Sequence, residues 1–325
     1  MFLKKYLTLF NPEQFQGARK KRSYFEGWYY KVINVTETKG FAFIPGIALD
    51  DNGNKQAFIQ VLDGKKKLSN YHAFAFDAFK ATPGSFQVSI LENRFSLDSI
   101  TLDLPDVRGR LQFHGEVPWP KHWYSPGIMG FYTFVPFMEC YHGIVSMYHT
   151  ISGHLEINGE TIDFTNGRGY TEKDWGRSFP SAYIWMQSNH FSETGISIKV
   201  SVARIPWIGM AFVGFIAGIW IRDHLIQFTT YNRSVLRMLK IDEKKVELVM
   251  ENKKYRLEIT ALRDAVTAAL ASPIRGRMDG RIEESMTSTI EVSLLDITTG
   301  KTILKDNGRN AGLEVAGKIE QILLL

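Results

Sequence analysis

Short runs of apolar and β-branched residues, separated by polar turn signals, recur along the whole chain. Strand-like runs at this spacing predict an all-β fold of antiparallel barrels or sandwiches. Helical periodicity is weak, and only residues 260–270 and 317–323 are expected to form short helices. Five pairs of runs are typical of hairpins, with Gly, Asn and Asp in the turns: 41–49 with 56–62, 85–90 with 94–97, 155–157 with 161–164, 214–221 with 224–231, and 288–295 with 302–304.

The length of 325 residues suggests two domains of about 150 residues each. Glycines loosen the chain around residues 166–176. Trp28 and Trp185 each open a half of the chain and are each followed by an apolar run containing Ile-Pro, which indicates a duplication. We therefore predict an N-terminal arm over residues 1–22, a first β domain over 23–170 and a second over 171–325.

The composition is that of a globular protein, with 44% hydrophobic and 22% charged residues, which excludes a mainly disordered chain. Cys140 is the single cysteine, so no internal disulfide is expected. The N-terminus has no apolar run of signal-peptide length, which favours a cytoplasmic location. The uncharged run 205–221 is short of the roughly 20 residues of a spanning helix and contains Pro206.

The net charge is +5 and the isoelectric point about 9.0. Basic clusters occur at residues 19–22 and 65–67, but no nucleic-acid-binding motif accompanies them, so no nucleic-acid partner is expected. The first 22 residues mix Phe, Leu and Lys, which suits either peripheral membrane contact or a solvated arm. The sequence does not set the oligomeric state.

Motifs for phosphate binding, for a nucleophilic serine and for zinc are absent from the sequence. The eight histidines show no metal-ligand spacing, and Glu139 with His142 forms a lone Glu-x-x-His in a strand-like run. We therefore expect neither a metal nor a cofactor.

Three segments place acids among large aromatics. In residues 24–31, strand alternation puts Glu26, Trp28 and Tyr30 on one face. Residues 137–149 embed Glu139 and His142 in apolar surroundings. The third segment, residues 169–189, carries the largest set of candidates: Glu172, Asp174, Trp175, Trp185, Gln187 and Asn189.

The acids of these segments can be interpreted in two ways. In the structural interpretation, Glu26, Glu172 and Asp174 form buried ion pairs with Lys31, Lys173 and Arg177. In the functional reading, burial raises the pKa of a carboxyl group, which then acts as a general acid. The faces of nearby Trp and Tyr rings stabilise a developing cation. Such a site suits the protonation of an electron-rich alkene.

At these residues the chain resembles the tocopherol cyclase family, within a lipocalin-like superfamily that includes carotenoid hydratases and related pericyclases. The resemblance runs from about residue 20 to the C-terminus. Three stretches carry it: Phe25-Glu-Gly-Trp-Tyr-Tyr30, the run Glu172-Lys-Asp-Trp-Gly176 continuing to Trp185-Met-Gln-Ser-Asn189, and Gly308-Arg-Asn-Ala-Gly-Leu-Glu-Val315.

The resemblance implies two lipocalin-like β domains and a cofactor-free intramolecular cyclase. Such an enzyme protonates the alkene of a prenylated hydroquinone, and the phenol oxygen closes a chromanol ring. The plant enzymes have Asn in place of Asp174 and lack the Cys140-Tyr-His142 sequence. The positions that match are Glu26, Trp28, Glu139, Glu172, Trp175, Trp185, Gln187 and Asn189.

We take Glu26, Glu139 and Asp174 as candidate proton donors. The candidate residues for contact with a hydrophobic small molecule are Trp28, Tyr30, His142, Glu172, Trp175, Trp185, Gln187 and Asn189. Two alternatives stay open: a non-enzymatic isoprenoid or lipid binder, and a hydratase or pericyclase acting on another polyene.

Overall fold

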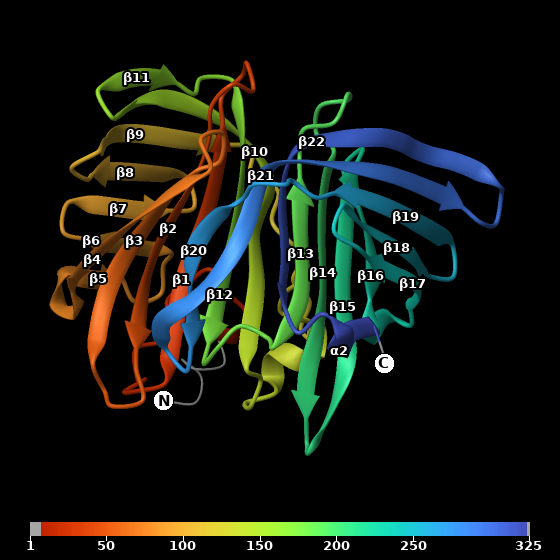
Figure 1. Cartoon of the computed structure of the whole chain (residues 1–325), viewed down its shortest axis with the longest axis horizontal. Helices are drawn as coiled ribbons and strands as arrows, with labels where there is room; N and C mark the ends of the chain where they lie inside the picture. The colour runs from red at the N-terminus through yellow and green to blue at the C-terminus, as the bar shows by residue number, and fades with distance from the viewer. Residues whose placement is uncertain (1–7, 324–325) are drawn as a thin grey trace. The chain divides into compact units, whose positions relative to one another are not determined.

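The structure is a computed structural model that describes residues 8–323 (Figure 1). It confirms the all-β prediction: two large antiparallel sheets account for nearly all regular structure of the described residues, and α2 (Glu320–Leu323) is a short helix. The chain forms two compact units. Unit 1 comprises residues up to Phe179 together with Leu270–Arg281, and unit 2 comprises Pro180–Ala269 and the residues from Ile282 onward.

The sheet of unit 1 has the strand order β4-β3-β2-β1-β12-β10-β9-β8-β7-β6-β5, with β11 paired to β10. Its two edge strands, β4 and β5, are joined by the short 3-10 helix η1 (Phe76–Ala78), so the sheet curls until its edges approach. The strand bounds are β1 Tyr24–Ile33, β2 Gly40–Leu49, β3 Lys55–Asp63, β4 Leu68–Ala75, β5 Phe79–Ala81, β6 Gln87–Ile90, β7 Asn93–Ser96, β8 Ser99–Asp103, β9 Val107–His114, β10 Cys140–Ile157, β11 Glu160–Asp163 and β12 Gly167–Gly176. A further 3-10 helix, η2 (Gly130–Phe134), lies between β9 and β10.

The sheet of unit 2 has the order β16-β15-β14-β13-β22-β21-β19-β18-β17, with β20 paired to β21. Its edge strands β16 and β17 are likewise consecutive in the chain, on either side of η3 (Thr230–Asn232). The bounds are β13 Ala182–Ser188, β14 Ser197–Trp207, β15 Met210–Ile221, β16 His224–Thr229, β17 Val235–Ile241, β18 Lys245–Glu251, β19 Tyr255–Leu262, β20 Ala268–Ile274, β21 Arg277–Asp296 and β22 Lys301–Gly317.

The two sheets follow the same path. In each sheet, a central strand (β1 or β13) and the three strands that follow it in the chain lie side by side in chain order out to the edge. On its other side the central strand pairs with the last long strand of its sheet, β12 or β22. Trp28 lies in β1 and Trp185 in β13. The tryptophans that suggested a duplication from the sequence therefore occupy equivalent strands.

The five predicted hairpins are confirmed by the pairings β2–β3, β6–β7, β10–β11, β15–β16 and β21–β22. The predicted helix over 260–270 is wrong: this segment ends β19 and begins β20, because side chains there alternate between buried and exposed, as strand pairing with β21 requires. The predicted helix over 317–323 is reduced to α2. The boundary predicted between residues 170 and 171 falls inside β12, which lies wholly in unit 1.

Each sheet buries one face in a core of its own, rich in aromatics in unit 1 and in aliphatic residues in unit 2. The turn between β20 and β21 belongs to unit 1, where the Gln60 amide forms two hydrogen bonds with the backbone of Ala271, of 3.0 and 2.9 Å. No helix within residues 8–323 has the length and apolar character needed to cross a membrane.

Candidate functional site

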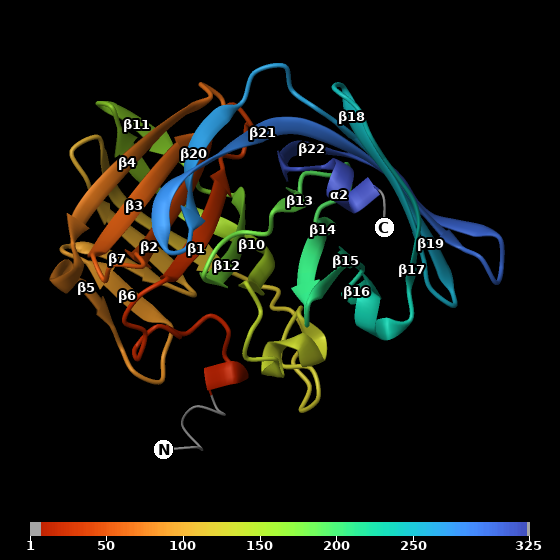
Figure 2. The same cartoon turned by 60° about the horizontal axis from the view of Figure 1, so that its bottom comes forward.

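The centre of the unit 1 sheet, formed by β1, β12 and β10, brings together most of the candidate residues from the sequence (Figure 2). Opposed residues of antiparallel strands share a face. Glu26 opposes Trp175 and Trp28 opposes Lys173 on the face that packs into the core. The other face carries the opposed pair His142 and Asp174, together with the alternate β12 positions Tyr170 and Glu172. We call these the core face and the outer face.

On the core face, Glu26 and Lys173 form a fully buried ion pair, with 2.5 Å between Lys173 Nζ and Glu26 Oε1. The hydroxyl of Tyr24 donates a hydrogen bond of 2.6 Å to Glu26 Oε2, and the backbone N–H of Gln16 donates one of 2.8 Å to Oε1. All three of these partners donate to the carboxylate oxygens of Glu26. For Glu26 the structure therefore shows the buried ion pair of the structural interpretation, with Lys173 as the cation.

The ammonium group of Lys173 also donates to the carbonyl oxygens of Pro12 (2.9 Å) and Gln14 (2.5 Å). It lies 4.7 Å from the ring centroid of Trp28 and 4.8 Å from that of Trp175. Burial lowers the pKa of Lys173, and the Glu26 charge opposes that shift.

Residues 11–17 of the N-terminal arm cover this ion pair. The indole N–H of Trp28 donates to the Glu13 carbonyl at 2.8 Å, and the Glu13 carboxylate is 3.0 Å from Lys121 Nζ. A Cβ at Gly17 would lie 2.6 Å from the Tyr24 ring, which shows how closely the arm packs. This part of the arm is buried or half-buried rather than solvated, whereas residues 18–22 are exposed and residues 1–7 lie outside the described residues.

The outer face holds a chain of titratable groups. His142 Nδ1 lies 2.7 Å from Asp174 Oδ1, and its Nε2 lies 3.6 Å from Glu172 Oε2. The Tyr170 hydroxyl donates a hydrogen bond to that same Glu172 oxygen, and burial, followed by the Glu172 charge, raises the pKa of Tyr170 well above its usual value. The exposed fraction of the side chain rises through this series of contacting groups, from 5% for Glu172 to 12% for His142 and 24% for Asp174.

This outer-face cluster, defined as Tyr170, Glu172, His142 and Asp174, can hold and pass protons. An imidazole between two carboxylates can exchange protons with either. His142 contacts Asp174 at 2.7 Å and lies 3.6 Å from Glu172, beyond hydrogen-bond distance, and the gradient in exposure leads from the buried acid toward solvent. The ligand atoms of His142, Glu172 and Asp174 lie within 4.8 Å of one another, so these three residues are also the group that could hold a metal ion.

Tyr30 and Glu139 lie apart from this cluster. Tyr30 belongs to the aromatic core of unit 1, and its hydroxyl donates to the Ser96 carbonyl at 2.8 Å. Glu139 directly precedes β10 and is half-buried; its backbone carbonyl accepts a hydrogen bond of 2.8 Å from the Arg177 N–H.

Trp185, Gln187 and Asn189 belong to unit 2 and are all buried. Trp185 and Gln187 lie in β13 on the face opposite the aliphatic core, since the alternate residues Ile184 and Met186 fill that core. Trp185 lies over Gly312, where a Cβ would come within 2.5 Å of the indole ring. Glycine at this position therefore makes room for the tryptophan.

Sequence reasoning missed Tyr170, Tyr24 and the arm carbonyls as partners of the candidate acids. The spacing of Tyr170, Glu172 and Asp174 at every second residue was a readable signal, because strand alternation puts the three on one face. No local pattern signals that the backbone of residues 12–14 reaches Lys173, since that contact joins segments about 160 residues apart.

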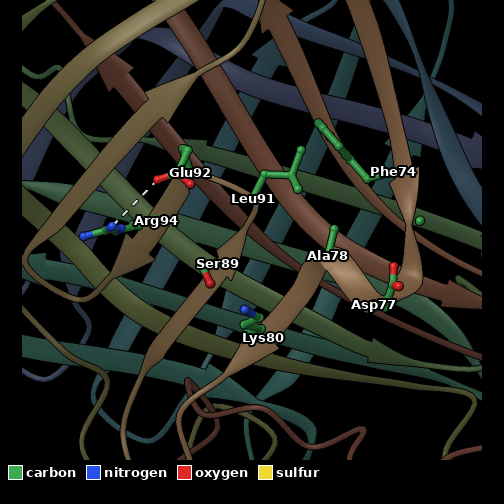
Figure 3. Close-up of a pocket in the computed structure, with 9 residues that line it drawn as sticks. Phe74, Asp77, Ala78, Lys80, Ser89, Leu91, Glu92 and Arg94 are labelled. Carbon is green, nitrogen blue, oxygen red and sulfur yellow. Dashed lines mark ion pairs between the residues drawn. The ribbon is translucent and has the colours of Figure 1, made fainter.

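A separate hollow of about 670 Å³ opens in unit 1 beside the edge strands β4 and β5 (Figure 3). Phe74, Ala78 and Leu91 supply its apolar lining. Glu92 and Arg94 on its rim are 3.9 Å apart and largely exposed, so this ion pair is solvated. None of the candidate residues from the sequence lines this hollow.

Comparisons with known proteins agree with these observations. The family described as tocopherol cyclase-like matches residues 86–317. A probable chloroplastic tocopherol cyclase of Oryza sativa is 25% identical over 201 residues, which are 58% of this chain and 42% of the rice protein. This chain thus spans less than half the length of that relative.

Two solved structures share the fold. A crystal structure of CghA with Sch210972 has a TM-score of 0.56 at 9% identity and covers 90% of this chain and 88% of its own. A structure of AttH from Nitrosomonas europaea has a TM-score of 0.53 at 13% identity and covers 89% and 92%. The matched family region extends over more than two thirds of the sequence and contains β10, β12 and β13, so the chain belongs to the tocopherol cyclase-like family.

Proposed function

We propose that this protein is a cofactor-independent isomerase that closes the ring of a prenylated hydroquinone to a chromanol by acid-initiated cyclisation. Membership of the tocopherol cyclase-like family supports the substrate class. The observation that carries the chemistry is the outer-face cluster, in which a buried carboxyl group, Glu172, lies beside a histidine and a tyrosine hydroxyl.

Glu172 is the proton donor in this proposal. Its side chain is 5% exposed, and burial of a carboxyl group favours its protonated form, which has a proton to donate to an alkene. It matches an acid of the plant enzymes in the sequence resemblance, whereas Asp174 does not. Glu26, by contrast, accepts hydrogen bonds from Tyr24 and Gln16 and pairs with Lys173, which leaves it no proton to donate.

The reaction balances without a co-reactant. The Glu172 proton adds to the less substituted alkene carbon, and the π electrons form that C–H bond and leave a tertiary cation. A lone pair of the phenol oxygen closes the C–O bond, and the phenol proton passes to the cluster. His142 and Asp174 then return a proton to Glu172, so the enzyme ends as it began and the product is an isomer of the substrate.

The test is incubation of the purified protein with geranylgeranyl hydroquinone in D₂O, followed by chromatography and mass spectrometry. We expect a chromanol that carries one non-exchangeable deuterium. Glu172→Gln should lower turnover at least about 100-fold, the usual contribution of a general acid, and leave substrate binding intact. Glu156→Gln, an exposed acid on β10, is the matched control and should keep wild-type turnover.

Other outcomes would overturn the proposal in distinguishable ways. A product with the mass of the substrate plus one molecule of water, with one deuterium retained on carbon, indicates a hydratase. Substrate that stays bound and unchanged indicates a carrier. Wild-type turnover in Glu172→Gln would leave the cyclase reading in place but remove Glu172 as the donor.

A further inference from the structure

The β14–β15 hairpin of unit 2 extends past the strands that flank it (Figure 1). β13 pairs with β14 only over Ile198–Ala203, and β16 pairs with β15 only over Ile216–Ile221. The pairing between β14 and β15 continues beyond both, from Arg204 with Val213 to Trp207 with Met210. Within the described residues, 204–213 is therefore a two-stranded ribbon without a third strand.

Both faces of this ribbon are apolar. The register divides its residues into a face of large side chains and a face of small ones, and the turn adds Ile208 and Gly209. Ile208 and Met210 are each 76% exposed. The large face comprises Ile205, Trp207, Met210 and Phe212. The small face comprises Pro206 and Ala211 and, at the base of the ribbon, Val213 opposite Arg204.

The tip of this ribbon is unfavourable in water, because two strands alone are marginally stable and the side chains of Ile208 and Met210 remain hydrated. A protein partner would cover one face and leave the other wet. A lipid layer surrounds the tip on every side. No charged residue occurs between Ile205 and Ile221, so insertion desolvates no ionised side chain. From these observations we infer that the tip of the β14–β15 hairpin inserts into the interface of a lipid bilayer.

The charge at the base of the ribbon fits this depth. Arg204 precedes Ile208 by four residues, which places it roughly 13 Å from the tip at the rise of a β-strand. Inserted apolar groups reach about 5–10 Å into the boundary between headgroups and acyl chains, so Arg204 lies at the level of the lipid phosphates. Trp207 lies between Arg204 and the tip, at the depth that indole rings prefer.

Membrane contact deepens the proposed function, on which it partly rests, because a prenylated hydroquinone dissolves in bilayers rather than in water. The argument from the ribbon itself uses no substrate. The experiment below also uses none, so a failure of this inference and a failure of the cyclase proposal can be told apart.

The experiment is co-sedimentation of the full chain with phosphatidylcholine vesicles, with and without about 30% of the anionic lipid phosphatidylglycerol. The comparison measures how much negative lipid charge adds to binding. We expect the double variant Ile208→Ser/Met210→Ser to bind about 10- to 100-fold more weakly than wild type, from the loss of two buried apolar side chains. The matched control is Leu68→Ser/Val266→Ser, which removes two exposed apolar side chains elsewhere (63% and 60% exposed) and should bind like wild type.

A second measurement locates the inserted residue. Lipids brominated near the headgroup should quench part of the tryptophan fluorescence, and Trp207→Phe should abolish that part while it keeps vesicle binding. The inference is overturned if wild type binds neither vesicle or if the hairpin variant binds as well as the control variant. It is also overturned if wild type forms a concentration-dependent oligomer that the hairpin variant loses, because a second copy then covers the ribbon.

Discussion

The two faces of the β1–β12–β10 sheet use similar residues in opposite ways. On the core face, the Glu26 carboxylate and the Lys173 ammonium neutralise each other, and the arm carbonyls and two indole rings complete the lysine's surroundings. On the outer face, Glu172 lies beside His142, and His142 contacts Asp174, which is the most exposed of the three side chains. The difference teaches that a buried acid among aromatics is structural when its cation is fixed, and able to donate a proton when its partner can exchange one.

The largest effect should come from breaking the core-face ion pair. Lys173→Met leaves the fully buried Glu26 without its cation, and an uncompensated buried charge costs about 3–5 kcal/mol of the free energy of unfolding. Urea unfolding followed by tryptophan fluorescence measures this loss. The double variant Glu26→Gln/Lys173→Met removes both charges and should recover most of it; equal losses in the single and double variants would contradict the ion-pair reading.

Replacing each of the two acids by glutamine in turn separates effects on stability from effects on turnover. Glu26→Gln should destabilise the protein by about 1–3 kcal/mol, because Lys173 loses a charged partner, yet keep turnover per folded molecule within a few-fold of wild type. Glu172→Gln should do the reverse, with turnover lost and the unfolding midpoint little changed. Parallel urea and turnover measurements on both variants check this, and a loss of turnover in Glu26→Gln at full folding would return Glu26 to the list of donors.

The two faces also differ in their histidines on β10: His142 lies on the outer face and His149 on the core face. His149 packs 4.5 Å from the Phe113 ring on the core side, and burial lowers its pKa to about 3, against 6.5 unperturbed. The folded state then binds fewer protons than the unfolded state below pH 6.5, so stability is full above that pH and is lost as the pH falls toward 3. At pH 5 the loss is about 2 kcal/mol.

Urea unfolding of wild type and His149→Gln at pH 7.5 and pH 5 measures this contribution. The variant is expected to be less stable at pH 7.5 because the packing changes, but its loss of stability between the two pH values should be smaller than that of wild type by about 2 kcal/mol. An identical pH dependence in both proteins would show that His149 remains accessible to protons.

The smallest effect should come from Asp174→Asn. Asp174 contacts His142 rather than Glu172 in the structure. We expect turnover to fall by no more than about 10-fold, because the amide oxygen still accepts a hydrogen bond from His142 Nδ1 while reprotonation slows. Turnover is measured by product formation per minute, and a loss as large as that of Glu172→Gln would make Asp174 the donor.

The strands of the molecule could be predicted well from the sequence, and the surroundings of the candidate acids only in part. The turn dipeptide Asn158-Gly159 predicts its hairpin because few other backbone conformations suit it. The segment 260–270 was mistaken for a helix because its local propensity is helical and only its pairing with β21 makes it extended. The sequence alone does not show that Lys173 pairs with Glu26, because Glu172 and Asp174 are equally plausible partners.

The sequence by itself determined the strand alternation, and with it the division of β12 into Tyr170, Glu172 and Asp174 on one face and Lys173 and Trp175 on the other. It could not determine which face becomes the core, because both carry aromatic and charged residues. The tertiary structure decided this when residues 11–17 packed over Lys173 and when β10 placed His142 between Glu172 and Asp174. Such contacts join segments distant in the chain, and their energies depend on burial that no local pattern contains.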